Sequence, residues 1–261
     1  MNHRPRKRFG QHFLTSSETI EQIVSAIAPR EGETIVEIGP GRAAITRPLA
    51  ALASELHAIE FDRDLAAALK MEFVDNDRVT IHEADALTFD FSSIGTNLRI
   101  VGNLPYNIST PLLFHLLAYK TCIADAHFML QKEVVDRMCA SPGGKSFGRL
   151  TVMLGCQMEV VTLFDVPPTA FSPPPKVMSS VIRMRPIPEP GIEVVDTDLL
   201  ATIVRSAFSR RRKTLRNALQ GVVEVEDLIA VDINPGNRPE QVPIADWITL
   251  ANHIAAIQSS G

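Results

Sequence analysis

The apolar positions in the first half of this chain repeat with two different periods. From Ile20 to Ile27 they recur at i, i+3, i+4 and i+7, which predicts an amphipathic helix over residues 16–28. Short apolar runs bounded by turn residues predict buried strands, the first at 34–38. Strands that alternate with helices build a parallel, doubly wound sheet, so the predicted fold class is α/β. The further predicted elements are strands near 55–60, 78–83, 98–102 and 125–130 and helices at 43–53, 62–73 and 110–119.

The second half of the chain has a different pattern. Two strand-like runs, 158–166 and 176–184, flank a proline-rich turn, and Pro186, Pro188 and Pro190 mark a linker. Because a chain of 261 residues exceeds what one core usually fills, we expect two unequal domains, 1–190 and 191–261. A helix near 148–156 is predicted within the first domain. The second domain is predicted to be small and all-helical, with helices near 197–208, 211–220 and 239–257.

Glycines follow the first predicted strand, at the turn into the next helix. Gly39 and Gly41 let the backbone approach a ligand that also meets a helix N-terminus. Glu60 ends the next strand 21 residues after Gly39, where its carboxylate can accept hydrogen bonds from both hydroxyls of a ribose. The pair predicts a site for a cofactor that contains adenosine. Taken alone, it does not distinguish NAD from S-adenosylmethionine.

A second loop, Asn103-Leu104-Pro105-Tyr106, follows the fourth predicted strand at the same sheet edge. The Asn103 amide oxygen and a main-chain carbonyl can accept hydrogen bonds from an exocyclic amine, and the Tyr106 ring can stack on a base. The N6 amine of adenine is a poor nucleophile, because its lone pair is delocalised into the ring. Two acceptors draw it toward tetrahedral geometry, and alignment with a sulfonium methyl group supplies most of the catalysis. The loop therefore favours S-adenosylmethionine.

Together these segments resemble the ribosomal RNA adenine dimethyltransferases, on the small-subunit side of the family rather than the erythromycin-resistance side. The resemblance implies a Rossmann-like S-adenosylmethionine-dependent methyltransferase domain with a small helical C-terminal domain. It also implies dimethylation of the N6 amines of two adjacent adenosines near the 3′ end of small-subunit (16S) rRNA, with a role in subunit biogenesis. The matching motifs are Phe9–Leu14, Val36–Gly41, Glu60–Asp64, Asp85–Ala86, Gly102–Ile108, Phe128–Val134, Phe171–Val177 and Arg211–Asn217.

The resemblance also assigns roles residue by residue. It implies a catalytic group in which Tyr106 and Phe171 flank a flipped adenine. The chain departs from the family at His12, where many members carry asparagine. By themselves, Phe171 is typical of a local hydrophobic anchor and Asp85 of a turn former, so only the resemblance gives them a role. The catalytic set is Asn103, Leu104, Tyr106 and Phe171, and the cofactor-binding set is His12, Leu14, Gly39, Gly41, Glu60, Asp85 and Asn103.

Positive charge is segregated along the chain. The formal net charge is −4, which disfavours a nucleic-acid partner because the phosphate backbone attracts basic surfaces. Two stretches without carboxylates reverse that argument: residues 1–17, which hold Arg4 to Arg8, and residues 205–216. We expect the second stretch to open a helix and bind rRNA phosphates, the alternative being a solvated helix face. The predicted RNA-binding residues are Arg210, Arg211, Arg212, Lys213 and Arg216.

Other features limit the location and the chemistry. The three cysteines form no C-x-x-C pair and the seven histidines show no metal-ligand spacing, so we expect a metal-free protein of the reducing cytoplasm. No secretory signal or membrane span is predicted. The expected partner is the small ribosomal subunit, bound by a monomer. The alternatives are an adenine-N6 methyltransferase of large-subunit rRNA or DNA, a non-catalytic assembly or transcription factor of the same fold and, more distantly, a NAD-dependent oxidoreductase.

Overall fold

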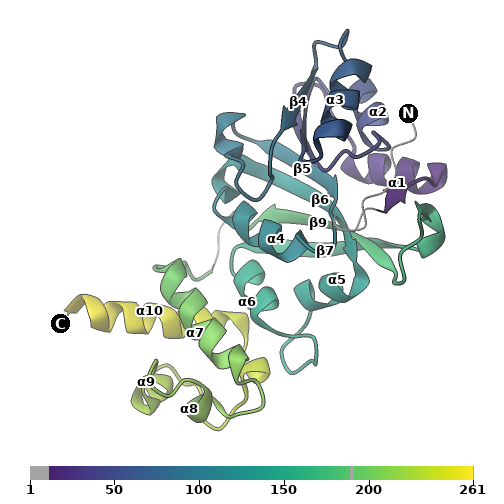
Figure 1. The fold of residues 1–261 in the computed structure, drawn as a ribbon. Helices are drawn as coiled ribbons and strands as arrows, with labels where there is room; N and C mark the ends of the chain where they lie inside the picture. The colour runs from purple at the N-terminus through teal and green to yellow at the C-terminus, as the bar shows by residue number, and fades with distance from the viewer. Residues whose placement is uncertain (1–11, 189–190, 261) are drawn as a thin grey trace. The chain divides into compact units, whose positions relative to one another are not determined.

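The computed structural model describes residues 12–188 and 191–260, which form two compact units (Figure 1). The sheet unit comprises residues 12–135 and 160–186, and the helical unit comprises 136–159 and 187–260. The predicted boundary near 190 lies close to one junction, but the segment 136–159 belongs with the C-terminal helices instead of the first domain. The reason is that its helix α6, Arg149–Gly155, packs against two helices of the second unit, α7 (Thr197–Ser209) and α10 (Ile244–Ser260).

A seven-stranded sheet has the order β4-β3-β2-β5-β6-β9-β7 within the described residues. The five strands from β4 to β6 are parallel, as the alternating pattern predicted. β9 runs antiparallel to β6, so the sheet is mixed; the sequence pattern predicted no direction for this strand. The bounds are β2 Thr34–Ile38, β3 Glu55–Glu60, β4 Val79–Glu83, β5 Leu98–Asn103, β6 Ile123–Gln131, β7 Met158–Val166 and β9 Ser179–Pro186.

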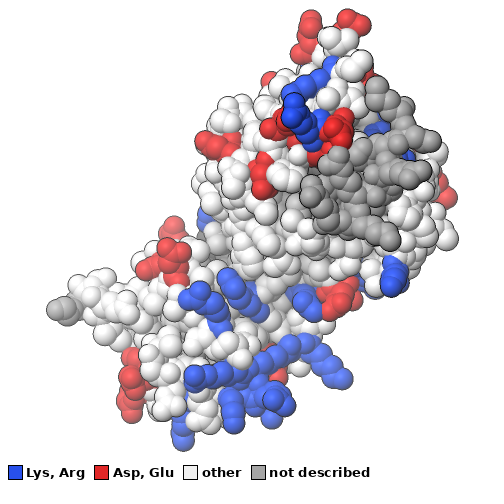
Figure 2. All heavy atoms as spheres, viewed as in Figure 1, with Lys and Arg blue, Asp and Glu red and all other residues white. Residues whose placement is uncertain are grey.

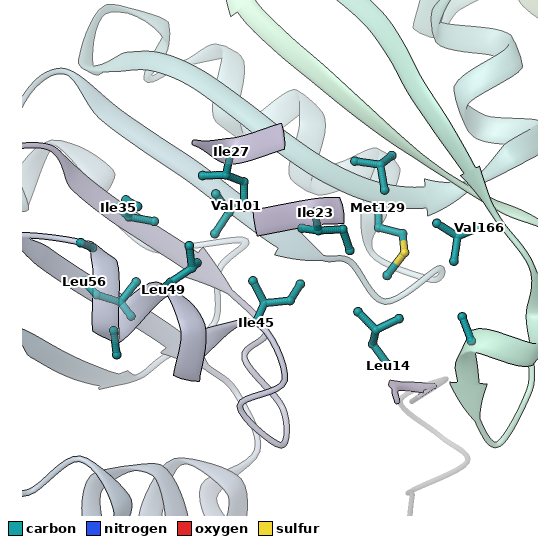
Figure 3. Packing of buried hydrophobic residues seen from close by; sticks show 14 of the residues in the cluster. Leu14, Ile23, Ile27, Ile35, Ile45, Leu49, Leu56, Val101, Met129 and Val166 are labelled. Carbon is teal, nitrogen blue, oxygen red and sulfur yellow. The ribbon is translucent and has the colours of Figure 1, made fainter. Parts of the chain in front are cut away.

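Helices α1 and α2 cover one face of this sheet. Ile23 and Ile27 of α1 and Leu49 of α2 pack on apolar side chains of β2, β3, β5 and β6, as Figure 3 shows. The α1 helix is capped by Ser16, whose hydroxyl accepts a hydrogen bond from the Thr19 amide. The helices of the sheet unit are α1 Ser17–Ile27, α2 Thr46–Leu52, α3 Arg63–Glu72 and α4 Ser109–Leu117, and α5 Lys132–Met138 continues into the helical unit.

A two-stranded pair holds the N-terminal segment in place. Strand β1, Phe13–Leu14, pairs antiparallel with β8, Phe171–Ser172. The Thr15 amide also donates to the Ala170 carbonyl at 2.8 Å. The sequence pattern did not predict this pair, because two residues are too few to show a period. It ties the segment after residue 11 to the proline-rich turn.

The helical unit is built around the aromatic side chains of Trp247, Phe208 and Phe147. Trp247 is fully buried, and its ring lies 6.0 Å from that of Phe208. The predicted helix at 211–220 is wrong, because residues 210–213 form a turn and only α8, Leu215–Ala218, is helical. Helix α9 was not predicted. The remaining helices are α7 Thr197–Ser209, α9 Val225–Ala230 and α10 Ile244–Ser260.

No helix in the described ranges is both long and apolar enough to cross a bilayer.

Candidate active site

A cavity of about 350 Å³ opens at the carboxyl ends of the parallel strands. It lies where the strand order reverses between β2 and β5, which is the usual ligand site of an open α/β sheet. The segments that follow β2, β3, β4 and β5 all contribute to its wall, together with the N-terminal segment at 12–14. The wall therefore joins both sequence motifs, the glycine turn and the Asn103–Tyr106 loop. Its lining ranges are 12–14, 37–42, 44–45, 59–62, 84–87 and 103–108.

Both glycines of the glycine turn have a left-handed backbone conformation. Gly39 and Gly41 have φ angles of +69° and +57°, in the left-handed region that favours glycine. A Cβ on Gly41 would lie 3.3 Å from the Phe13 ring, so a side chain there would crowd the N-terminal segment. The Gly39 amide donates to the Ile59 carbonyl at 2.9 Å, which ties the turn to β3. The main chain of the glycine turn lines the cavity, where a ligand can contact it.

Two buried carboxyls lie in the cavity wall. Glu60 accepts hydrogen bonds from the Gly41 amide at 3.1 Å and the Asp62 amide at 2.8 Å, so the predicted cofactor residue also braces the glycine turn. Burial raises the pKa of Glu60, and these amide bonds partly oppose the rise. Glu37 is only 2% exposed, and its Oε2 atom has no hydrogen-bond partner among the described residues.

Glu37 is the site residue that the sequence analysis missed. Burial raises its pKa to about 7; the neighbouring Thr46 hydroxyl lowers it, and repulsion from Glu60 adds a smaller rise. The available signal was a carboxyl two positions before Gly39, in a strand that the sequence predicts to be buried. Together the two carboxyls favour a ligand that carries hydroxyl or amino donors.

Asp85 and Asn103 both line the same cavity. Asp85 accepts a hydrogen bond from the Leu87 amide at 2.9 Å with one of its oxygens, so it does form the turn that its residue type suggests. The Asn103 amide nitrogen donates to the His12 carbonyl at 3.3 Å. Because the nitrogen is used in this bond, the amide oxygen remains an acceptor for a ligand. The contact of this oxygen with a target amine stays a prediction.

The Tyr106 ring lies in the cavity wall, and hydrogen bonds hold both ends of the residue. Its hydroxyl lies 2.9 Å from the Ser179 hydroxyl, and its carbonyl accepts from Ser109 Oγ at 3.2 Å. Burial raises the pKa of the Tyr106 phenol. Leu104 is buried, and its amide donates to the Met129 carbonyl at 3.2 Å. The loop is therefore fixed on the sheet before any ligand arrives.

The N-terminal segment brings His12 and Leu14 into the wall. The His12 Nδ1 atom donates to the Pro173 carbonyl at 2.8 Å, and its ring lies 5.6 Å from the Tyr106 ring. Residues 9–11 of the same motif lie outside the described residues. Phe171 does not line the cavity: it is 4% exposed and packs in the hydrophobic cluster that contains Leu14. This position is the one expected of a local hydrophobic anchor in the proline-rich turn. It gives no support to the role in which Phe171 flanks a flipped adenine.

The predicted RNA-binding residues lie in the helical unit, in the turn between α7 and α8 and on α8 itself. Figure 2 shows basic side chains gathered over this unit, with fewer acidic ones. Arg211 is partly engaged, since Nη2 donates to the Gly144 carbonyl at 3.2 Å and Nε lies 3.5 Å from Glu240. Arg210 donates to the Asn217 carbonyl at 3.3 Å. The other three, all exposed, are Arg212, Lys213 and Arg216.

The predicted basic cluster at Arg4–Arg8 lies outside the described residues. Within the described part of the chain, no three His, Cys, Asp or Glu side chains gather as ligands for a metal ion.

Comparison with known proteins gives consistent results. The model of the family described as "Ribosomal RNA adenine dimethylase" matches residues 2–256. The chain is 53% identical over 253 residues to "Ribosomal RNA small subunit methyltransferase A" of Thiobacillus denitrificans, covering 97% of this chain and 99% of the relative. The Pseudomonas aeruginosa protein of the same name is 50% identical over 98% of this chain and 96% of its own. The crystal structure of a dimethyladenosine transferase from Plasmodium falciparum has a TM-score of 0.82 at 24% identity, covering 94% and 98%, and supports the fold.

Proposed function

Since the chain belongs to the ribosomal RNA adenine dimethylase family, we propose that it is the enzyme that dimethylates the N6 amines of two adjacent adenosines near the 3′ end of 16S rRNA. The observation that carries the proposal is one cavity lined by both motifs. The glycine turn with Glu60 lies in the same wall as the Asn103–Tyr106 loop. A cofactor site and an amine site that share one cavity allow direct transfer between them.

The cavity fits S-adenosylmethionine in chemistry and in size. Its volume lies within the range of small-molecule sites, and the glycine turn leaves main chain free to approach a ligand. Glu37 keeps a buried oxygen that has no hydrogen-bond partner among residues 12–188 and 191–260, which suits a ligand with amino or hydroxyl donors. When bound, S-adenosylmethionine supplies an electrophilic methyl group. The residues that we propose to hold it are His12, Leu14, Gly39, Gly41, Glu60, Asp85 and Asn103.

The target amine meets acceptors supplied by the loop after β5. The Asn103 amide oxygen and the Leu104 carbonyl would accept its two hydrogens, and the Tyr106 ring would stack on the adenine. No strong base is required, because an N6 atom that has gained a methyl group and kept its protons is very acidic. Phe171 would flank the base only after leaving the hydrophobic cluster, so we assign the stacking role to Tyr106.

The partner that we propose is the small ribosomal subunit, bound by a monomer in the cytoplasm. The cations of residues 210–216 would contact rRNA phosphates, and the exposed Arg212, Lys213 and Arg216 are the strongest candidates. We propose no role for a metal ion or a membrane.

The test is to incubate the protein with labelled S-adenosylmethionine and unmethylated small subunits, and then to map the label. Label on adjacent adenosines near the 3′ end is the expected result. Label on large-subunit rRNA or DNA instead would overturn the substrate assignment. Subunit binding with no transfer would favour the non-catalytic assembly factor.

A further inference from the structure

The hydroxyl of Tyr106 has one hydrogen-bond partner among the described residues, and that partner lies on a different strand. Ser179 Oγ is 2.9 Å from the Tyr106 hydroxyl, 73 positions away in the chain. Ser179 is fully buried. A fully buried serine placed at the tip of a cavity-lining tyrosine has no solvent to bond with, so its hydroxyl depends on the tyrosine hydroxyl for a partner.

The position of Ser179 is fixed by the sheet. It is the first residue of β9 and lies opposite Gln131, the last residue of β6. The Lys132 amide donates to the Met178 carbonyl at 3.0 Å, which pins the start of β9 to the carboxyl edge of the sheet. The serine hydroxyl is therefore anchored to the same rigid edge that carries the cavity.

The neighbouring serine provides an internal comparison. Ser180 is also fully buried, but its hydroxyl donates to Asp165 at 2.6 Å. Successive residues of a strand point to opposite faces. The two serines therefore lie on the same strand and are equally buried, and they differ in their hydrogen-bond partners.

We propose that Ser179 is a positioning residue for the RNA substrate, which fixes the position of the Tyr106 ring so that the target base meets a preformed stacking surface. Rotation about the Cα–Cβ bond swings the ring and carries the hydroxyl with it, and a hydrogen bond at the far end of the ring restricts that motion. Fixing the ring before binding reduces the ordering cost of capturing the base. The inference rests on the proposed function, in which Tyr106 stacks on the adenine.

The experiment compares Ser179→Ala, Ser180→Ala, Tyr106→Phe and the double variant Ser179→Ala/Tyr106→Phe. KM for unmethylated small subunits and kcat are measured, with the dissociation constant of S-adenosylmethionine from calorimetry. Ser179→Ala should raise KM about three- to tenfold, the range for one lost neutral hydrogen bond, and leave cofactor affinity unchanged. In the Tyr106→Phe background the same substitution should have no further effect, because the hydroxyl that it serves is already absent.

Two results would overturn the inference. One is an effect of Ser179→Ala on KM that is the same in both backgrounds, which would indicate a general packing role. The other is an equal effect of Ser180→Ala. Tyr106→Ala separates this inference from the proposed function: if it leaves KM unchanged, the stacking role itself is wrong and both fail. If it raises KM while Ser179→Ala and Tyr106→Phe act independently, only the positioning role of Ser179 is wrong.

Discussion

Glu37 and Glu60 place two acidic groups in the wall of one cavity, and only Glu60 is engaged by main-chain amides. The Glu37 side chain offsets the cost of its burial by holding a proton at pH values where an exposed glutamate is ionised. A ligand that brings a positive charge or a hydrogen-bond donor next to Glu37 reduces the cost of ionising this carboxyl. The cavity therefore favours ligands of that kind. The same two residues give predictions that differ in kind.

The first prediction concerns stability against pH. The pKa of Glu37 is about 7 in the folded protein and near 4.5 in the unfolded chain, so its contribution is full below pH 4.5 and is lost as the pH rises through 7. Between pH 4.5 and 8, wild type should lose about 3 kcal/mol of unfolding free energy relative to Glu37→Gln. Urea unfolding across this range measures the difference. The exposed Glu21→Gln is the control, and curves for Glu37→Gln that run parallel to wild type would contradict the prediction.

The second prediction concerns cofactor affinity. Glu60→Ala should weaken S-adenosylmethionine at least tenfold, since it removes charge-assisted hydrogen bonds worth about 1.5–3 kcal/mol each and also releases the Gly41 amide. Calorimetry gives the dissociation constant directly. Glu83→Ala is a matched control, because Glu83 pairs with Glu60 in the β3–β4 register and lies outside the cavity wall. Equal affinity of Glu60→Ala and wild type would show that the ribose is held elsewhere.

The third prediction separates binding from chemistry. Asn103→Ala should lower kcat by about a hundredfold, the scale for one lost hydrogen-bonding group that acts on the transition state. The change in cofactor affinity should be much smaller, because Glu60 and the glycine turn remain. Single-turnover methylation of small subunits measures the step. The exposed Asn107, in the same loop, gives the control Asn107→Ala, and a near-normal rate for Asn103→Ala would exclude the polarising role.

At the scale of elements, periodicity predicted the central strands β2, β3, β5 and β6 well because each is a largely buried run between turn residues. The glycine turn and the loop after β5 could be placed together for the same reason, since parallel strands bring their carboxyl ends to one edge. The β1–β8 pair could not be predicted, because each strand has two residues and its partner is distant in sequence. The contact between Ser179 and Tyr106 could not be predicted from the sequence either, because it depends on the register of β9 against β6.

The turn at 210–213 shows a different limit. A run of basic residues followed by Leu215 has helical composition, yet the chain turns there and Thr214 becomes the N-cap of a helix of four residues. The Leu215 amide donates to the Asn237 carbonyl and the Arg216 amide to the Pro235 carbonyl. These bonds to a distant loop replace helical ones, and no local pattern encodes them. Helix propensity is a weak preference that tertiary contacts override.

At the scale of the whole molecule, the proposed contact with rRNA phosphates is electrostatic, which leads to the fourth prediction. Replacing Arg212, Lys213 and Arg216 with Ala should flatten the dependence of subunit affinity on salt by about two to three units of log–log slope, roughly one for each phosphate that a cation no longer neutralises. Cofactor affinity should not change. Filter binding of small subunits across a salt series measures the slope. Arg63→Ala, an exposed cation of the sheet unit, is the control, and parallel salt dependences would identify the cluster as a solvated surface.

The two units are interleaved in the chain, which passes from one to the other after residues 135, 159 and 186. Helix α6 buries Val152 and Leu154 completely and packs on α7 and α10, and a Cβ on Gly155 would lie 2.6 Å from Ile244. A fragment cut at residue 190 would keep α6 and lose the helices that cover it. No single cut in the chain therefore separates the two units, and a gene fusion or domain exchange with one breakpoint would divide at least one of them.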